Sequence, residues 1–565
     1  MNKKLKNIIM IIIMISMCVL MFLTMNYAKN NLKSTNDNSP MNNLKSTNDN
    51  SPMNNTLEKP DDNRPNMENP NGMIGLNDVK ITYIYYVVFG TESLIFVSVL
   101  VYFIMSNLNK KSLKETFVNS DKVIIYVLLV IVLSTFMTLL DGVVTNKLLS
   151  NNNTNNINEN KNNNSNKSSS ISYKGVEKIT QDKKIDSGNF TSTTSDENAL
   201  LISGDIDVDI ENISVSKTGD SDGGDNTSFY GINSGIIAKD GAELTLKNIT
   251  VTTNAIGANG VFSYGGSATT NNSKSDGTTI TISDSKIATT SDNSGGIMTT
   301  GGGIMNANNL EVTTSGTSSA AIRSDRGGGT VTVNKGTYKT TGVGSPSIYS
   351  TADITVNDAE LISTKSEGIV IEGANSVVLN NSTLTDTNNT LNGKSTTYKN
   401  IFLYQSMSGD AMYGTSSFTS TNSKIITNKG DTFYVTNTSA TITLENNEII
   451  NNDSTGNFLR IQKDSWGNSG ANGGNVTLSL KNQEVAGSIV VDSISTLDMN
   501  LTSSYYEGAI NNSNTAKKIS LTISKDSKIK LTGNTYVSSL TNEDETNSNI
   551  DFNGYKLYVN NVSIN

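Results

Sequence analysis

The chain has 565 residues, with 43 Lys or Arg, 52 Asp or Glu, one Cys and no His. The absence of His excludes an imidazole base, a Ser-His-Asp or Cys-His nucleophile and a His metal ligand, while the single Cys18 excludes an internal disulfide and a multi-Cys metal cluster. The net charge of −9 argues against nucleic acid as a partner, because nucleic-acid binding requires a basic surface.

Three apolar runs occupy residues 7–25, 81–105 and 123–144. Each is close to the roughly 20 residues that cross a bilayer. We therefore expect a signal-anchor transmembrane helix within residues 1–29 and a transmembrane helical hairpin at 79–147. Lysines lie before the first run and between the other two. We therefore expect a cell-membrane protein with its N-terminus in the cytoplasm and its C-terminal domain outside the cell. The first run could instead be a cleaved signal peptide.

Glu92 lies near the middle of the second apolar run. A carboxyl group inside the bilayer is costly and is therefore a candidate functional group. It could bind a membrane partner or mediate self-association, it could serve transport, or it could be a protonated, hydrogen-bonded spectator.

Two segments have the composition of flexible linkers. The predicted extracytoplasmic loop at 30–78 contains two identical twelve-residue units, NNLKSTNDNSPM, at 30–41 and 42–53. The predicted linker at 148–190 begins with a run rich in Asn and Ser. Neither segment has enough apolar surface to offset the entropy of ordering, so we expect both to be disordered.

Residues 191–565 contain a recurring unit of two short alternating strands separated by Asn or Asp and followed by a Thr-rich turn. Examples are LTLKNITVTT at 244–253, TITISDSKIATT at 279–290 and ITVNDAELIST at 354–364. Equivalent inward positions lie 23 to 41 residues apart, and are Ile210, Leu246, Ile282, Ala307, Val333, Val356, Leu379, Ser420, Leu444 and Leu480. This pattern predicts an all-β parallel β-helix in which stacked coils bury a continuous apolar column.

The longer gaps predict loop insertions, which in a solenoid commonly emerge on one face. The insertions lie at 219–235, 261–277, 389–417 and 460–475, and they carry Tyr404, Tyr413 and Trp466. Aromatic side chains outside the core can stack on sugar rings, so we predict ligand binding by these three residues. The alternative is that they pack the insertions onto the rod.

Two charged clusters are further candidates. Arg323 and Asp325 alternate on one strand next to Arg326. An arginine guanidinium there could bind the carboxylate of an acidic sugar. The alternative is a solvated ion pair at the edge of the stack. Asp220, Asp222 and Asp225 surround two glycines and could form a Ca²⁺ site or a solvated acidic cap.

The segments at 323–356, 401–414 (IFLYQSMSGDAMYG) and 549–561 (NIDFNGYKLYVNN) resemble bacterial adhesin-like surface proteins of the right-handed parallel β-helix, pectate-lyase-like group. The resemblance covers about residues 191–565 and implies a right-handed β-helix. Some β-helices of this kind are polysaccharide lyases that use Ca²⁺ and an Arg base, whereas the polygalacturonase-like pattern needs a His that this chain lacks.

The sequence as a whole favours a membrane-anchored extracytoplasmic β-helix protein for adhesion or carbohydrate recognition, with a cell-surface glycan or host ligand as partner. It shows no convincing catalytic cluster. Two alternatives stay open, a Ca²⁺-dependent polysaccharide lyase using Arg323 or Arg326, and a structural envelope component that assembles through the hairpin.

Overall fold

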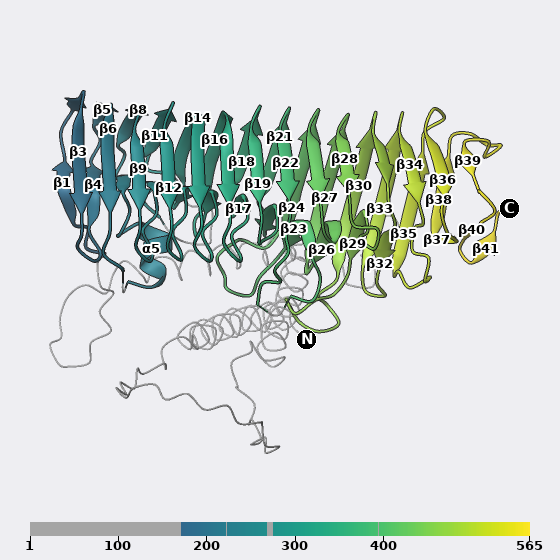
Figure 1. The fold of residues 1–565 in the computed structure, drawn as a ribbon. Coiled ribbons are helices and arrows are strands. Elements are labelled where there is room, and N and C mark those ends of the chain that lie inside the picture. Colours follow the sequence, from purple (N-terminus) through teal and green to yellow (C-terminus); the bar gives the residue numbers. More distant parts are fainter. Residues whose placement is uncertain (1–170, 222, 268–274, 394) are drawn as a thin grey trace, which may run out of the picture. The chain divides into compact units, whose positions relative to one another are not determined.

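The computed structural model describes residues 171–221, 223–267, 275–393 and 395–565. The three apolar runs, Glu92 and the twelve-residue repeats lie outside the described residues. In the part of the chain that is described, no helix has the length and apolar character needed to span a bilayer. The described residues form one compact unit that is nearly all β, with long parallel sheets consistent with a parallel β-helix (Figure 1).

The first long sheet, which we call sheet A, takes one short strand from each coil. Each of its strands pairs in parallel with the equivalent strand of the next coil. Its twelve strands are β1 (Gly175–Ile179), β4 (Asn198–Ser203), β7 (Ile236–Lys239), β10 (Val261–Tyr264), β13 (Ile297–Thr300), β15 (Ile322–Ser324), β17 (Ile348–Ser350), β20 (Ile369–Glu372), β23 (Lys399–Tyr404), β26 (Asp431–Thr436), β29 (Leu459–Ile461) and β32 (Ile489–Val491).

The second long sheet, which we call sheet B, takes the other strands of most coils. Its members are β2 (Lys183–Ile185), β3 (Gly188–Ser192), β5 (Asp207–Glu211), β6 (Ile213–Lys217), β8 (Glu243–Lys247), β9 (Thr250–Thr253), β11 (Thr279–Ser283), β12 (Lys286–Thr289), β14 (Gly303–Thr314), β16 (Gly329–Thr340), β18 (Asp353–Asn357), β19 (Glu360–Ser363), β21 (Ser376–Asn380), β22 (Thr383–Asp386), β24 (Thr415–Thr421), β25 (Lys424–Thr427), β27 (Thr438–Glu445), β28 (Glu448–Asn451), β30 (Gly474–Lys481), β33 (Thr496–Thr502), β35 (Lys518–Ile523) and β38 (Ser539–Asn542).

Two small sheets complete the C-terminal coils. One contains β31 (Glu484–Ala486), β34 (Tyr505–Gly508), β36 (Lys528–Leu531) and β39 (Ile550–Asp551). The other contains β37 (Thr535–Val537), β40 (Leu557–Val559) and β41 (Val562–Ser563). β41 runs antiparallel to β40, so the chain ends in a reversal of direction rather than in another parallel strand.

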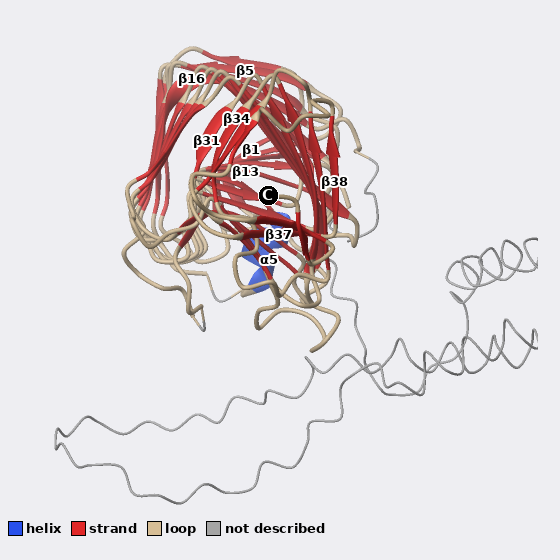
Figure 2. Cartoon of the chain, turned by 90° about the vertical axis from the view of Figure 1, so that its right-hand side faces the viewer, coloured by secondary structure: helices blue, strands red, loops and turns tan. Residues whose placement is uncertain are grey.

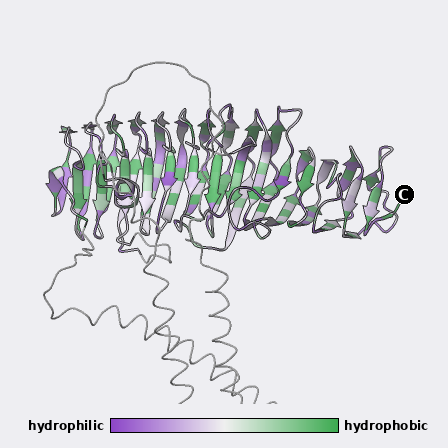
Figure 3. Cartoon of the chain, turned by 90° about the horizontal axis from the view of Figure 1, so that it is seen from below, coloured by the Kyte–Doolittle hydropathy of each residue, from purple (hydrophilic) through white to green (hydrophobic). Residues whose placement is uncertain are grey.

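The predicted stacking register is confirmed. All ten aligned inward positions pair with their predicted neighbours, from Ile210 opposite Leu246 to Leu444 opposite Leu480. Their side chains are buried, and the nine apolar members join one continuous core cluster along the solenoid. Figure 3 shows hydrophobic segments recurring from strand to strand along the rod. Ser420 is the polar exception, and its hydroxyl donates to Asn447 Oδ1 at 2.8 Å.

The Asn and Asp residues between the two strands of each unit turn the chain. Asn248, Asp284 and Asn309 have φ of 51°, 49° and 54°, the left-handed region that Asn and Asp tolerate better than other side chains. Stacked amides also hydrogen-bond from coil to coil, as in the 2.7 Å bond from Asn248 Nδ2 to Asn212 Oδ1. The corners therefore add polar ladders parallel to the apolar column.

The Thr-rich turns contain a second polar column. The hydroxyls of Thr253 and Thr289 are buried and donate to carbonyls five residues later, at 2.7 and 2.5 Å. Lys217 is the buried counterpart of Thr253 in the preceding coil. Its ammonium donates to three backbone carbonyls at 2.6 to 3.0 Å, so the charge is held within the turn.

The predicted linker boundary at residue 190 is wrong, because the first coil lies within that segment. β1 and β2 precede residue 191 and β3 begins at Gly188, with Ile179 buried and Ile185 and Phe190 packed against the core. The dense Lys, Glu and Asp of residues 174–186 concealed this coil, because only Ile179 and Ile185 in that range pack into the core, while Val176 is exposed.

Candidate functional site

One face of sheet A is unusually apolar for an outer surface. Its outward side chains, which pair in register from coil to coil, form a row that we call the outer row: Leu201, Ile237, Phe262, Met298, Arg323, Tyr349, Val370, Phe402, Tyr434, Arg460 and Val490. A row of this composition must be shielded from water. The insertions provide the cover.

The covering segments gather on one side of the solenoid. The helix α5 (Asp225–Tyr230) and the long loops after β22, β23 and β29 lie on the same side of the rod in two perpendicular views (Figures 1 and 2). Phe229 packs with Phe262 and Met298 in one cluster, and Trp466 packs on a second cluster that includes Phe402 and Tyr434. This agrees with the prediction of a shared face for the segments at 219–235, 389–417 and 460–475. The predicted insertion at 261–277 begins with β10 and the one at 389–417 contains β23, so both include strands of sheet A.

Arg323 and Asp325 share a face of the sheet, as their spacing predicts, but they are buried. Arg323 Nη2 lies 3.0 Å from Asp325 Oδ2, and the two side chains are 11% and 8% exposed. Arg323 also donates to Ser228 Oγ and to the Ser318 carbonyl, both at 3.1 Å. The pair is therefore neither a solvated surface pair nor free to grip the carboxylate of a sugar.

Burial raises the pKa of Asp325 to about 6, against the lowering effect of Arg323. The neighbouring Asp410 acts in the same direction as burial. Asp325 is therefore a carboxyl group that titrates close to neutral pH in the middle of the covered face.

Arg326 joins two of the insertions. Its Nη2 and Nε lie 2.7 and 3.2 Å from Asp410 Oδ1 in the loop after β23. Its guanidinium carbon lies 4.0 Å from the ring centroid of Phe229 in α5, within the range of a cation–π interaction. We call this arrangement of Arg326, Asp410 and Phe229 the clamp.

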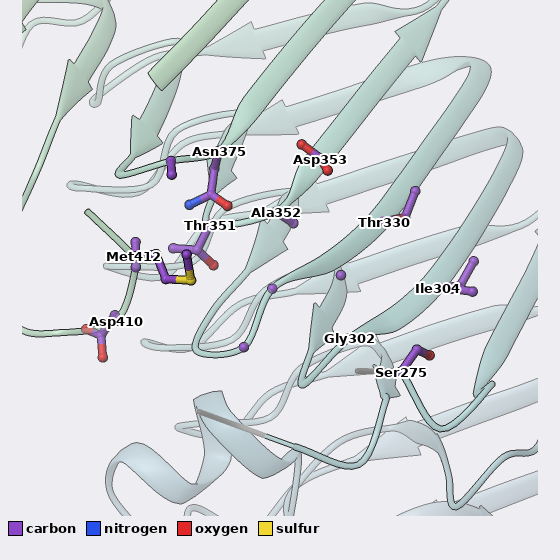
Figure 4. Close-up of a pocket in the computed structure, with 15 residues that line it drawn as sticks. Ser275, Gly302, Ile304, Thr330, Thr351, Ala352, Asp353, Asn375, Asp410 and Met412 are labelled. Atoms are coloured by element: carbon purple, nitrogen blue, oxygen red, sulfur yellow. The ribbon is translucent and has the colours of Figure 1, made fainter. Parts of the chain in front are cut away.

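Beside the clamp runs a groove of about 320 Å³, which we call the corner groove (Figure 4). Its floor is made by the corners of four successive coils at residues 302, 327–329, 351–353 and 374–375. Residues 410–412 form one wall, and Asp353 and Asp410 are its charged side chains. Asp353 accepts a 2.6 Å hydrogen bond from Ser376, and Asp410 accepts those of Arg326.

Further along the outer row is a cluster of aromatic side chains. Phe402 and Tyr404 stack at 4.5 Å between ring centroids, and Tyr434 meets Phe402 edge-on at 5.7 Å. Trp466 covers Tyr404 at 5.1 Å. Because Tyr404 is buried beneath it, Tyr404 supports Trp466 and does not present a face to solvent, in contrast to its predicted role as a ligand contact.

A buried carboxylate fixes this cluster from below. Glu372 accepts hydrogen bonds from the hydroxyls of Tyr349 at 2.5 Å and Tyr404 at 2.9 Å, and from the hydroxyl of Ser406. Burial, together with the negative charge of Glu372, raises the pKa of both tyrosines. Three hydroxyl donors on one carboxylate hold the rings in fixed positions.

A buried cation lies at the other side of the cluster. Lys399 Nζ is 4.6 Å from the ring centroid of Phe402 and 5.0 Å from that of Tyr434. The same ammonium donates to Ser395 Oγ at 2.8 Å and lies 3.7 Å from Glu367 Oε1. The charge of Lys399 is thus matched within the protein.

These groups line a cavity of about 420 Å³, which we call the aromatic pocket. Trp466 and Phe402 provide its rings, and Met407, which is 61% exposed, stands at its rim. The polar lining residues are Glu367, Asn392, Ser395, Lys399, Asp464 and Ser465. Of the three predicted aromatic ligand residues only Trp466 lines this pocket, while Tyr413 is 76% exposed and stands outside the lining.

The predicted calcium ligands are only partly described. Asp220 is exposed and accepts a hydrogen bond from the Ile256 amide at 2.8 Å, and Asp225 is exposed at the start of α5. Asp222 lies outside the described residues, so the three-residue set is not tested. Elsewhere in the described part of the chain, no group of three or more Cys, Asp or Glu side chains is placed to hold a metal ion.

Sequence reasoning missed the residues that complete the site, namely Lys399, Glu372, Asp410 and Asp464. One signal was available in the sequence. The segment KNIFLY (399–404) ends in four consecutive apolar or aromatic residues and so does not alternate with polar ones, and the structure buries all six of its residues. Comparison of the chain with family models, curated proteins and solved structures finds no match.

Proposed function

We propose that the protein is a membrane-anchored, extracytoplasmic surface protein whose right-handed parallel β-helix recognises carbohydrate through the aromatic pocket. The observation that carries the proposal is the combination of a half-buried indole with carboxylate, amide and hydroxyl groups around one cavity. Sugar rings have apolar faces and polar edges, and pockets with an aromatic wall and a few convergent polar groups fit such ligands.

The location rests on the sequence. The apolar runs at 7–25, 81–105 and 123–144 and their lysine flanks support an anchor in the cell membrane with the β-helix outside. The absence of His and the presence of a single Cys in the whole chain fit a binding role better than a catalytic one.

A glycan array probed with the full chain tests the proposal. We expect binding to at least one glycan class and a loss of at least about tenfold, or about 1.4 kcal/mol, in Trp466→Ala. Tyr555→Ala is the matched control, because Tyr555 is a partly exposed aromatic residue at the C-terminal end of the rod. Absence of binding to every glycan, or equal binding by Trp466→Ala, would refute the proposal.

A further inference from the structure

The charged groups of the aromatic pocket differ in how far a ligand can reach them. Lys399 and Glu367 have side-chain exposures of only 3% and 10%, and they lie against each other. Asp464 is half-buried at the pocket wall. Among the described residues that line the pocket, Asp464 is therefore the most exposed charged group, whereas the ammonium of Lys399 is already matched by Glu367.

Asp464 is held in place but keeps capacity to bind. Its Oδ2 accepts the hydroxyl of Tyr434 at 2.8 Å and its Oδ1 accepts the Ser465 amide at 2.6 Å. A carboxylate offers about four lone-pair sites, so two remain for donors from a ligand. Asn472, whose amide donates to the carbonyls of Asp464 and Trp466 at 2.7 and 2.9 Å, fixes the loop that carries both residues.

We infer that the aromatic pocket takes an uncharged sugar ring, stacked on Trp466 with hydroxyls donated to Asp464, and selects against uronic acids and other anionic sugars. This inference rests on the carbohydrate function proposed above and names its ligand class. Like charges brought together in a partly desolvated site are strongly unfavourable, so Asp464 acts by repulsion as well as by attraction.

The inferred ligand, an uncharged sugar, is the opposite of the acidic sugar that the sequence suggested from Arg323. An acidic sugar would need an accessible cation. Among the described residues, Lys399 in the pocket lining and Arg323 and Arg326 in the predicted cluster are each bound to a carboxylate of the protein. The arginine Arg460 is likewise paired with Asp431. The negative net charge of the chain acts in the same direction over longer distances.

The test compares neutral hexose and N-acetylhexosamine oligosaccharides with oligogalacturonate and oligoglucuronate of the same length, using the full chain and calorimetry. We expect the neutral series to bind at least tenfold more tightly than the acidic series. Asp464→Asn should reduce that ratio at least threefold, mainly by improving the acidic ligands. Asp498→Asn, which changes an exposed carboxylate on β33, should leave the ratio unchanged.

The outcomes separate this inference from the proposed function. Equal or tighter binding of the acidic oligosaccharides, abolished in Trp466→Ala, would overturn the inference and keep carbohydrate recognition. An unchanged ratio in Asp464→Asn would also overturn it. Binding of neither series, with an empty glycan array, would overturn the proposed function itself.

Discussion

The clamp predicts that one side chain controls the closure of a covering loop. Arg326 and Asp410 are 32% and 20% exposed, so their ion pair is partly screened and contributes about 1 kcal/mol. The guanidinium over Phe229 adds about 0.5–1 kcal/mol. Phe229 belongs to α5, so only the pair with Asp410 is lost when the 405–414 loop opens, and Arg326→Ala should favour that opening by about 1 kcal/mol, or roughly fivefold.

Hydrogen exchange measured by mass spectrometry is the assay, because it resolves local opening from global unfolding. Peptides covering 405–414 should lose protection in Arg326→Ala, while peptides from the inward strands β18 and β21 should not. A double-mutant cycle with Asp410→Ala isolates the pair. A coupling energy below about 0.3 kcal/mol, or an equal loss of protection along the whole rod, would refute the reasoning.

Two further predictions concern stability. Asp325 has a folded-state pKa of about 6, above its ordinary value, so the folded protein holds that proton more tightly and the stabilisation is present at low pH and lost as pH rises through 6. The difference between the Tm of Asp325→Asn and that of the unmodified protein should therefore become more positive from pH 4 to pH 7. A difference that stays constant with pH would contradict the raised pKa of Asp325. Phe433 lies edge-on between Phe418 and Phe458 at 5.6 and 5.5 Å in the core, so Phe433→Ala should cost about 3–5 kcal/mol in urea unfolding. A cost below 1 kcal/mol, well under the range for a buried Phe, would show that the stack relaxes around the cavity.

The interior of the solenoid was predictable because two simple constraints act on it together. Alternation places every second residue inside, and parallel stacking requires the inward residues of successive coils to meet. A slip of one residue would turn all inward side chains outward, so the register has one solution. This is why the positions from Ile210 to Leu480 could be aligned across gaps of unequal length.

The covered face could be predicted only in fragments. Spacing alone shows that Arg323 and Asp325 point to one side, but their burial depends on α5 and on the loop after β23, which come from distant parts of the sequence. The contact between Lys399 at the start of β23 and Glu367 in the turn before β20 spans 32 residues, and no local pattern marks it. The sequence therefore placed Arg323 and Asp325 on the same face correctly, but the prediction that they could be exposed to solvent was wrong.

The same geometry explains how a varied outer face can coexist with a strict register of the inward residues. An insertion placed at a turn lengthens the gap between coils, yet the strands on both sides still stack, as Leu379 and Ser420 do across 41 residues. That one gap contains both the 389–398 segment and the loop at 405–414, which supply Asn392 and Met407 to the aromatic pocket. Residues in such loops contribute little to the inward column, so changes there alter the outer surface at small cost to the fold. The loops after β22, β23 and β29 can therefore vary in sequence while the inward residues stay fixed.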